Sequence, residues 1–295
     1  MVTVLTRDEW QARRAAHRAR VRPWAEDRTR RMARGEKHPV YDFLFEYYPF
    51  RPAHLLRWSP GVEVVLADAT PADLDWPAYF TSDSGGQRIT AGSYPSHRAA
   101  FLTWLVGYLE AVAGREPFVG CFGLHEWAMV YRTADVRHNR VPLRLTAAET
   151  DAVVEAGVLC CTHYDAYRFF TPAAAPRNRT LLTRQTTAAH DQPGCLHATM
   201  DLYKWAWKLA PFLPAELTAD AFELAVAARE LDMRASPYDL RAFGFESVRI
   251  ETREGREEYV TAQRELARRA APVRGRLLEA CRLLEQIVSG VVAAG

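Results

Sequence analysis

The residues best suited to chemistry gather in one segment, CLHATMDLYKWAWKL at 195–209. Four polar side chains recur in it at spacings of four, three and four residues: His197, Asp201, Lys204 and Lys208. On an α-helix these spacings form a single stripe. Large apolar residues occupy both flanks of the stripe, so we expect it to face a cavity. Because an unpaired buried ion costs several kcal/mol, Asp201 either pairs with Lys204 and His197 as a satisfied core network or serves a site.

Two other segments, GLHEWAMVYR and CTHYDAYRF, each place a histidine beside an acid among aromatic residues. His125 and Glu126 are adjacent, so on a helix at most one of them shares a pocket. His163 and Asp165 alternate in a stretch that we interpret as extended, where both face the same side. A carboxylate in a dry aromatic pocket has a raised pKa and can act as a general acid or base. The candidate catalytic residues are therefore Asp201, Asp165, Glu126 and Lys204.

The same histidines also suit metal binding, because imidazole and carboxylate groups are ligands of zinc and iron. His125, His163 and His197, with Asp165 or Asp201, have the residue types of a mononuclear Fe or Zn site assembled from scattered segments. No H-E-x-x-H or H-x-H motif fixes its geometry. Each histidine can equally be a hydrogen-bonded core residue. Both interpretations stay open: no cofactor, or Fe or Zn.

Two further features have simpler structural interpretations. The segment LDMRASPYDL places Asp232, Arg234, Tyr238 and Asp239 at the end of an expected helix, where an Arg–Asp pair that closes the helix is the simpler interpretation. Cys195 lies at a helix N-terminus, where the helix dipole favours a thiolate. A small buried cysteine is the simpler interpretation there.

The elements that must position these residues are mostly helical. A capping box, Thr6 with Glu9, begins a helix over 6–34 that Pro23 could break. The other expected helices cover 95–114, 121–132, 146–157, 195–209, 215–234 and 256–293. One strand is expected at 62–68, extended backbone at 158–170, and loop at 70–94 and 171–194.

These elements predict a mainly α fold, a single helical domain with at most a small β-sheet and an Arg-rich N-terminal helix. Residues 1–37 form a basic helical arm in this prediction. Residues 38–295 form the mainly helical core domain that carries the site.

Composition narrows the function classes. The net charge of +2 gives no overall basic field for nucleic acid or an anionic membrane. Five cysteines without C-x-x-C spacing argue against a disulfide framework and a zinc ribbon, and favour a reducing cytoplasm. The start, MVTVLTRDEW, lacks a secretory pattern, and no segment reaches the length of a membrane span. We therefore expect a cytoplasmic protein without a membrane partner, and its oligomeric state is open.

Local charge in the first helix suggests a different partner. Arg14, Arg18 and Arg22 recur at four-residue spacing with tryptophans between the arginines of this segment. Guanidinium rows with interleaved aromatic rings suit phosphate backbones and base stacking. The alternative is a solvated helix whose arginines pair with acids such as Glu26 and Asp27.

Several blocks of the chain resemble a bacterial, mostly actinobacterial, family whose members are commonly labelled 3-methyladenine DNA glycosylase. The blocks are HPVYDFLFEYYPFRPAHLLRWSPG, GCFGLHEWAMVYR, CTHYDAYRFFTP, DQPGCLHATMDLYKWAWKL and LDMRASPYDL, and the resemblance runs from about residue 5 to 265. It implies hydrolysis of the N-glycosidic bond of an alkylated base, as in base-excision DNA repair, with DNA or a modified nucleobase or nucleoside as partner. The chain has no glycine-rich hairpin of the helix-hairpin-helix glycosylases.

Excision of a base requires stacking surfaces, a carboxylate near the sugar and contacts to phosphate. The candidate substrate-binding residues are His125, His163, His197, Trp127, Tyr131, Tyr164, Tyr203, Tyr41, Arg14 and Arg18. The leading prediction is a glycosylase-like hydrolase that needs no cofactor. The alternatives are a metal-dependent enzyme that acts on a small molecule, and a helical binding protein for an aromatic ligand without catalysis.

Overall fold

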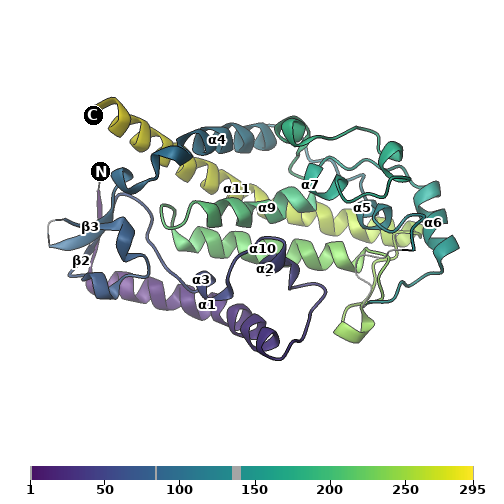
Figure 1. Cartoon of the computed structure of the whole chain (residues 1–295), viewed down its shortest axis with the longest axis horizontal. Coiled ribbons are helices and arrows are strands. Elements are labelled where there is room, and N and C mark those ends of the chain that lie inside the picture. Colours follow the sequence, from purple (N-terminus) through teal and green to yellow (C-terminus); the bar gives the residue numbers. More distant parts are fainter. Residues whose placement is uncertain (1, 84, 135–140, 295) are drawn as a thin grey trace.

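The computed structural model describes residues 2–83, 85–134 and 141–294 and is mainly α-helical, as predicted (Figure 1). Its helices are α1 (Arg7–Ala33), α2 (Phe43–Glu46), α3 (Pro52–Leu55), α4 (Ala99–Ala113), α5 (Leu124–Ala128), α6 (Ala147–Ala156), α7 (Tyr164–Tyr167), α8 (Thr187–His190), α9 (Leu196–Lys208), α10 (Ala215–Arg234) and α11 (Arg253–Ala294). Its strands are β1 (Thr3–Leu5), β2 (Val64–Ala67), β3 (Phe80–Asp83) and β4 (Gly86–Ile89).

The long helices run along the long axis of the molecule, and α9 lies among them (Figure 1). It packs against α10 and α11, and α11 also packs against α4. Ten of the thirteen residues of α9 are buried, including His197 and Asp201. A helix that is apolar on both flanks is stable only with cover on both sides, and α10 and α11 provide it. Of the expected stripe, His197 and Asp201 are therefore buried, Lys204 is partly buried and Lys208 is exposed. The expectation that the whole stripe faces a cavity is met for His197, whereas Asp201, Lys204 and Lys208 are not among the residues that line the cavity described below.

A four-stranded sheet of order β1-β2-β4-β3 lies at one end of the molecule (Figure 1). β1 pairs parallel to β2, and β2–β4 and β4–β3 are antiparallel. The predicted strand over 62–68 is confirmed as β2. The loop predicted over 70–94 was wrong where it contains β3 and β4. These strands are short and rich in polar residues such as Thr81 and Arg88, so they lack the apolar alternation that identifies a strand in sequence.

Helix ends follow their capping signals. α1 begins after Thr6, whose hydroxyl accepts from the backbone N–H of Glu9 while Glu9 accepts from the N–H of Thr6, and it continues without interruption past Pro23. The helix expected over 121–132 is shorter, because Phe122 and Gly123 adopt positive φ angles of 50° and 73° immediately before α5. None of the helices in the described part of the chain is long and apolar enough to cross a membrane.

The extended backbone expected over 158–170 is wrong in its second half, where Tyr164–Tyr167 form α7. His163 ends the irregular segment before this helix, and Asp165 lies in its first turn. The two residues are therefore not partners on one strand. Their proximity depends on the turn into α7.

A buried histidine on α1 makes the stability of the fold sensitive to acid. The Nε2 of His17 lies 3.0 Å from the carbonyl oxygen of Leu55. Burial lowers the pKa of His17, and the opposing effects of Leu55 and Glu216 do not restore it. The native state therefore binds fewer protons than the unfolded chain. The contribution of His17 to stability is complete above the unfolded pKa of about 6.5 and is lost as the pH falls through the native pKa.

We expect His17→Gln to lose less unfolding free energy than the wild type between pH 7 and pH 5. Urea unfolding followed by circular dichroism at several pH values measures this difference. His97→Gln, at an exposed position, is the matched control and should follow the wild-type pH dependence. Equal slopes for His17→Gln and the wild type would contradict the assignment.

Candidate functional site

Three imidazole rings lie in a row inside the helical core. His197 of α9 lies between His125 of α5 and His163, with ring centroids 4.6 Å and 5.3 Å away. All three side chains are buried. The scattered histidines of the sequence are therefore brought together, and each comes from a different segment.

The first group of possible ligands contains His125, His197 and Asp232. One ligand atom from each lies within 4.8 Å of the other two. The Nε2 of His125 lies 2.7 Å from Asp232 Oδ1, and its Nδ1 lies 3.5 Å from Cys121 Sγ. The ring of His197 contacts this group edge-on, with an interplanar angle of 78° to the ring of His125. Two imidazoles and one carboxylate form a donor set that binds Fe(II) or zinc.

A buried arginine supports this group from α10. Arg229 Nη1 donates to Asp232 Oδ2 at 2.7 Å and to Glu126 Oε1 at 2.9 Å. Its guanidinium carbon lies 4.2 Å from the centre of the Phe43 ring. Among the described residues, Glu126 Oε2 and the Nε and Nη2 of Arg229 have no hydrogen-bond partner. These buried polar atoms remain available to a ligand.

The second group contains His163, Asp165 and Asp201, again with one ligand atom each within 4.8 Å of the others. The Nδ1 of His163 lies 3.0 Å from Asp191 Oδ1, and Asp191 also accepts from the Tyr108 hydroxyl at 2.6 Å. This pair fixes the ring of His163 and directs its Nε2 toward Asp201 Oδ2, 3.9 Å away.

The charge of the Asp201 carboxylate is balanced by an ion pair within this group. Asp201 forms an ion pair with Lys204 and accepts from the Tyr48 hydroxyl at 2.8 Å. The Nζ of Lys204 also lies 3.7 Å from Asp165 Oδ2. The core network expected for the stripe therefore exists between Asp201 and Lys204, while His197 belongs to the first group.

The environment gives the three histidines different charges. Burial opposes protonation of His125 and His163, yet Asp232 raises the pKa of His125 well above its usual range and Asp191 raises the pKa of His163. Burial and the neighbouring His125 lower the pKa of His197 well below its usual range. His197 is therefore the neutral imidazole of the row, with a lone pair available to bind a metal or accept a proton.

Two acids of the site, Asp165 and Asp232, have lowered pKa values and not the raised pKa expected for a carboxylate in a dry pocket. Burial alone would raise the pKa of Asp165, but Lys204, His163 and Arg168 together lower it. Burial likewise opposes ionisation of Asp232, and His125 above all holds its pKa well below the usual range. Both side chains are therefore carboxylates at neutral pH, which suits electrostatic or ligand roles more than that of a general acid.

A cavity of about 720 Å³ opens beside both groups. His197 and Asp165 each contribute to its lining, as do Glu126 and Arg229. Aromatic side chains also line it: Phe43, Tyr47 and Phe169. Of the adjacent pair His125 and Glu126, only Glu126 lines this cavity, as the sequence predicted for a helix.

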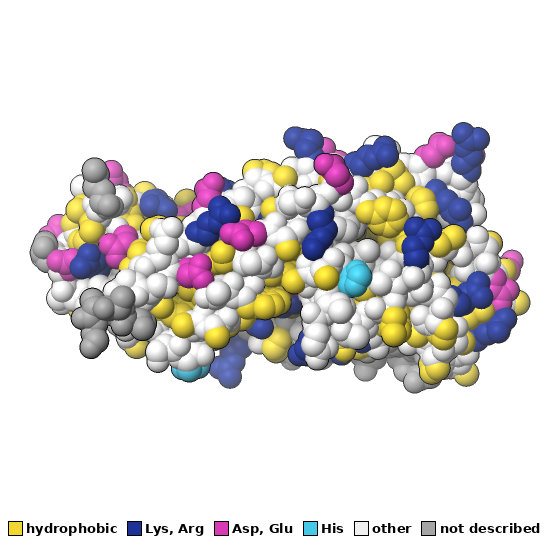
Figure 2. All heavy atoms as spheres, turned by 90° about the horizontal axis from the view of Figure 1, so that it is seen from above, with side chains coloured by type: hydrophobic (Ala, Val, Ile, Leu, Met, Phe, Trp, Pro, Cys, Tyr) yellow, Lys and Arg dark blue, Asp and Glu magenta, His cyan; other side chains and the backbone are white. Residues whose placement is uncertain are grey.

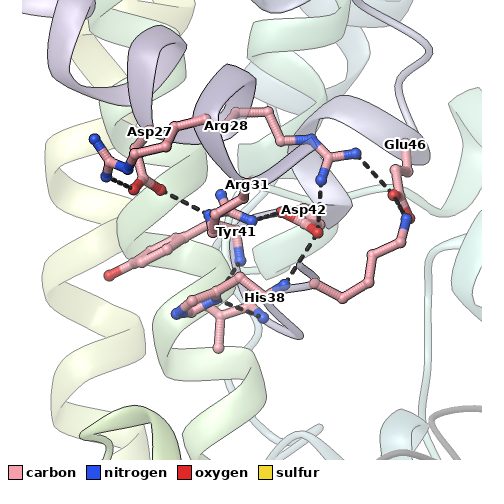
Figure 3. A network of polar contacts seen from close by, with 10 residues as sticks. Asp27, Arg28, Arg31, His38, Tyr41, Asp42 and Glu46 are labelled. Carbon is pink, nitrogen blue, oxygen red and sulfur yellow. Dashed lines mark hydrogen bonds and ion pairs between the residues drawn. The ribbon is translucent and has the colours of Figure 1, made fainter. Parts of the chain in front are cut away.

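One wall of the cavity is fastened to α1 by buried charges (Figure 3). Asp42 forms ion pairs with Arg28 and Arg31 of α1 and accepts from the backbone N–H of His38 at 3.0 Å. Arg28 also donates to Glu46 at 2.8 Å. Both His38 and Glu46 line the cavity, so these contacts hold its wall in place.

Five aromatic candidates lie outside the cavity lining: Trp127, Tyr131, Tyr164, Tyr203 and Tyr41. Three of these side chains form hydrogen bonds to other parts of the protein. Trp127 donates to the carbonyl of Ala235 at 2.9 Å, Tyr131 donates to Glu155 at 3.0 Å, and Tyr41 donates to Glu230 at 2.6 Å. The aromatic walls instead come from neighbouring positions in the same sequence blocks.

The arginines of α1 are engaged with the protein itself. Arg18 donates to both carboxylate oxygens of Asp75, at 2.6 and 2.8 Å. Arg14 donates to the carbonyl of Asp73 and lies 4.9 Å from the Trp10 ring centre. Arg22 pairs with Glu26, as the alternative interpretation proposed.

Basic and acidic side chains also alternate on the face that includes α4 (Figure 2). Contact of the protein with DNA stays a prediction.

An Arg–Asp pair does lie near the end of α10, but its arginine is Arg229 and not one of the residues of LDMRASPYDL. Asp232 binds His125 and Arg229, while Arg234 pairs with Glu258 at 3.0 Å. Arg229 was missed, although an arginine three residues before an aspartate in the apolar run ELAVAARELDMR is a detectable signal. For Cys195, burial raises the pKa, so its side chain is a thiol and not the thiolate that a helix N-terminus favours. The residue is partly exposed, so the expectation of a buried cysteine is met only in part.

Asp191 was also missed, and its position in the loop before α9 gave no local signal of its long-range partners.

The geometry defines a helical protein with a buried His/Asp cluster beside an aromatic-walled cavity. The chain matches no family model, and comparisons with curated proteins and with solved structures gave no match either. The glycosylase resemblance therefore stays a prediction.

Proposed function

We propose that the protein is a metal-dependent enzyme that transforms a small planar molecule in the cavity. The observation that carries this proposal is the convergence of His125, His197 and Asp232 within 4.8 Å beside that cavity. Zinc ligands lie about 2.0–2.2 Å from the ion, so modest side-chain rotation would bring the three atoms to one ion. The ion would replace the proton shared by His125 and Asp232. Bound there, Fe or Zn would supply a Lewis acid that lowers the pKa of a bound water and so provides a nucleophile at neutral pH.

The other residues of the site have distinct roles in this proposal. Arg229 holds the second oxygen of Asp232, which orients that carboxylate as outer-shell partners of metal ligands do. Its Nε and Nη2, which have no partner within the described residues, would donate to an acceptor on the substrate, and Glu126 Oε2 would accept from a donor. Phe43, Tyr47 and Phe169 favour a flat, apolar-faced substrate.

A second candidate function is hydrolysis of the N-glycosidic bond of an alkylated nucleobase. The aromatic walls and the carboxylates of Glu126 and Asp165 support it, because an alkylated base is flat and often cationic. In this mechanism Glu126 acts without a metal, either as a general base for the attacking water or as a negative charge that stabilises the sugar cation. The substrate is either a free nucleoside or an extruded base of DNA.

Elemental analysis of untagged protein tests the leading proposal. We expect Fe or Zn in at least equimolar amount in the wild type, and about 100-fold or greater weakening of binding at the first group in His197→Ala, because even outer-shell changes cost 10–100-fold. His97→Ala, at an exposed position, is the matched control and should keep its metal. A metal-free wild type from metal-supplemented cells, or full metal retention in His197→Ala, would overturn the proposal.

Incubation with alkylated DNA and with alkylated nucleosides separates the two functions. Release of free base by chelator-treated protein, abolished in Glu126→Gln, would favour the metal-free hydrolase. If no product forms but aromatic ligands raise the melting temperature, the protein is a binding module.

A further inference from the structure

We infer that a second divalent cation binds at His163, Asp165 and Asp201, so that the centre holds two ions. This extends the proposed function, but it uses none of the three ligands of the first ion. One imidazole nitrogen and two carboxylate oxygens lie within 4.8 Å of one another in this group. One imidazole and two carboxylates suit Fe(II), Mn(II) or Zn(II).

The orientation of His163 supports a ligand role. Its Nδ1 faces the buried carboxylate of Asp191, which Tyr108 holds from the other side. Ligating histidines commonly bind a carboxylate through the nitrogen that does not face the metal. The other nitrogen, Nε2, is aimed at Asp201 but lies 3.9 Å from its nearest oxygen, too far for a hydrogen bond. The side chain of His163 is only 3% exposed, and within the described residues its Nε2 lies near the carboxylates of Asp165 and Asp201 without a hydrogen bond to either.

A cation already occupies part of this group. The ammonium of Lys204 pairs with Asp201 and lies 3.7 Å from Asp165. It also lies 4.1 Å from the ring centre of Trp205, a position that can retain an ammonium displaced from the acids. A divalent ion that enters would take over both carboxylates and move Lys204 toward that ring.

The cavity provides access for the second ion. Asp165 lines the cavity and its side chain is 29% exposed, whereas Asp201 is buried and is not among the residues that line it. His197, a ligand of the first group, lines the same cavity and its ring centroid lies 5.3 Å from that of His163. Two ions in these groups would therefore face one substrate, an arrangement that can bind both the attacking and the leaving atoms.

The test is metal stoichiometry of the full chain after chelator treatment and reloading with Zn²⁺ or Mn²⁺. Elemental analysis after gel filtration should give two ions per chain in the wild type and one in Asp165→Asn. Asp8→Asn, an exposed acid on α1, should keep two. Circular dichroism verifies that each variant is folded, and His163→Gln replaces Asp165→Asn if that variant is not. Two ions in a folded Asp165→Asn or His163→Gln would overturn the inference.

The affinity of Lys204→Met for the second ion distinguishes a cation site from a group of residues that only stabilises the fold. Removal of the competing ammonium should tighten binding of the second ion by about 10-fold or more, since like charges about 4 Å apart repel strongly in a partly buried site. Unchanged or weaker binding would count against the inference.

The two proposals can fail separately. If the wild type binds one ion that His197→Ala loses and Asp165→Asn keeps, the second site is absent and the proposed function stands. If the single ion is lost in Asp165→Asn and kept in His197→Ala, the second site stands and the first centre is wrong.

Discussion

Asp232→Ala is expected to lower the free energy of unfolding by about 3–5 kcal/mol, the usual cost of removing one partner of a buried ion pair. Asp232 has 0% exposure, and its two oxygens bind His125 and Arg229. Without this carboxylate, Glu126 is the acid that still accepts from Arg229 among the described residues, and His125 loses the group that raises its pKa. Guanidinium unfolding followed by circular dichroism measures the change.

Asp220→Ala is the matched control on the same helix, α10. Asp220 pairs with Arg20 and Arg276 near the surface, where an ion pair contributes about 0–1 kcal/mol. Asp232→Asn keeps the shape of the side chain and can still accept from Arg229, so its loss should fall between those of the two alanine variants. A loss in Asp232→Ala no greater than in Asp220→Ala would show that the buried network does not stabilise the fold.

Local signals in the sequence were sufficient for the helices that place the site. The capping boxes at Thr6 and Thr146 begin α1 and α6 where they were expected. The apolar flanks of the segment over 195–209 correctly placed His197 and Asp201 in the interior. These features depend on residues within a few positions of one another, and periodicity and capping report such features directly.

The partners of the site residues could not be predicted in the same way. The four-residue spacing of His197 and Asp201 put both on one stripe, but α9 rises about 6 Å over four residues, so the two side chains meet different neighbours. His197 meets His125, and Asp201 meets Tyr48, a residue distant in sequence. The single metal site of three histidines expected from residue types is therefore two adjacent groups in the structure.

Charge patterns were similarly ambiguous. A row of arginines on α1 has the same sequence signature whether it binds phosphate or acids of the same chain. Arg18 has its partner, Asp75, far away in sequence, so only the tertiary fold reveals the pair. The same holds for Arg28 and Arg31, which meet Asp42 in the cavity wall.

That cavity wall gives the second large effect, expected in Asp42→Ala. Asp42 is 4% exposed and lies between Arg28 and Arg31 of α1 (Figure 3). Its removal leaves two buried guanidinium groups with fewer partners, and we expect a loss of about 3–5 kcal/mol in the free energy of unfolding. Asp42 immediately precedes α2, whose first residue, Phe43, packs against Arg229 at the cavity. Loss of Asp42 should therefore displace Phe43 and weaken ligand binding in the cavity as well.

Glu26→Ala is the control for this prediction, because Glu26 forms an exposed pair with Arg22 on the same helix, α1, and its loss should cost about 0.5 kcal/mol or less. Hydrogen exchange locates the effect: amides of residues 38–46 should lose protection in Asp42→Ala before those of α9, since α9 is held by α10 and α11 and not by this network. Uniform loss of protection in both regions would mean that Asp42 supports the whole core, and unchanged protection over 38–46 would mean that the ion pairs do not hold the wall at all.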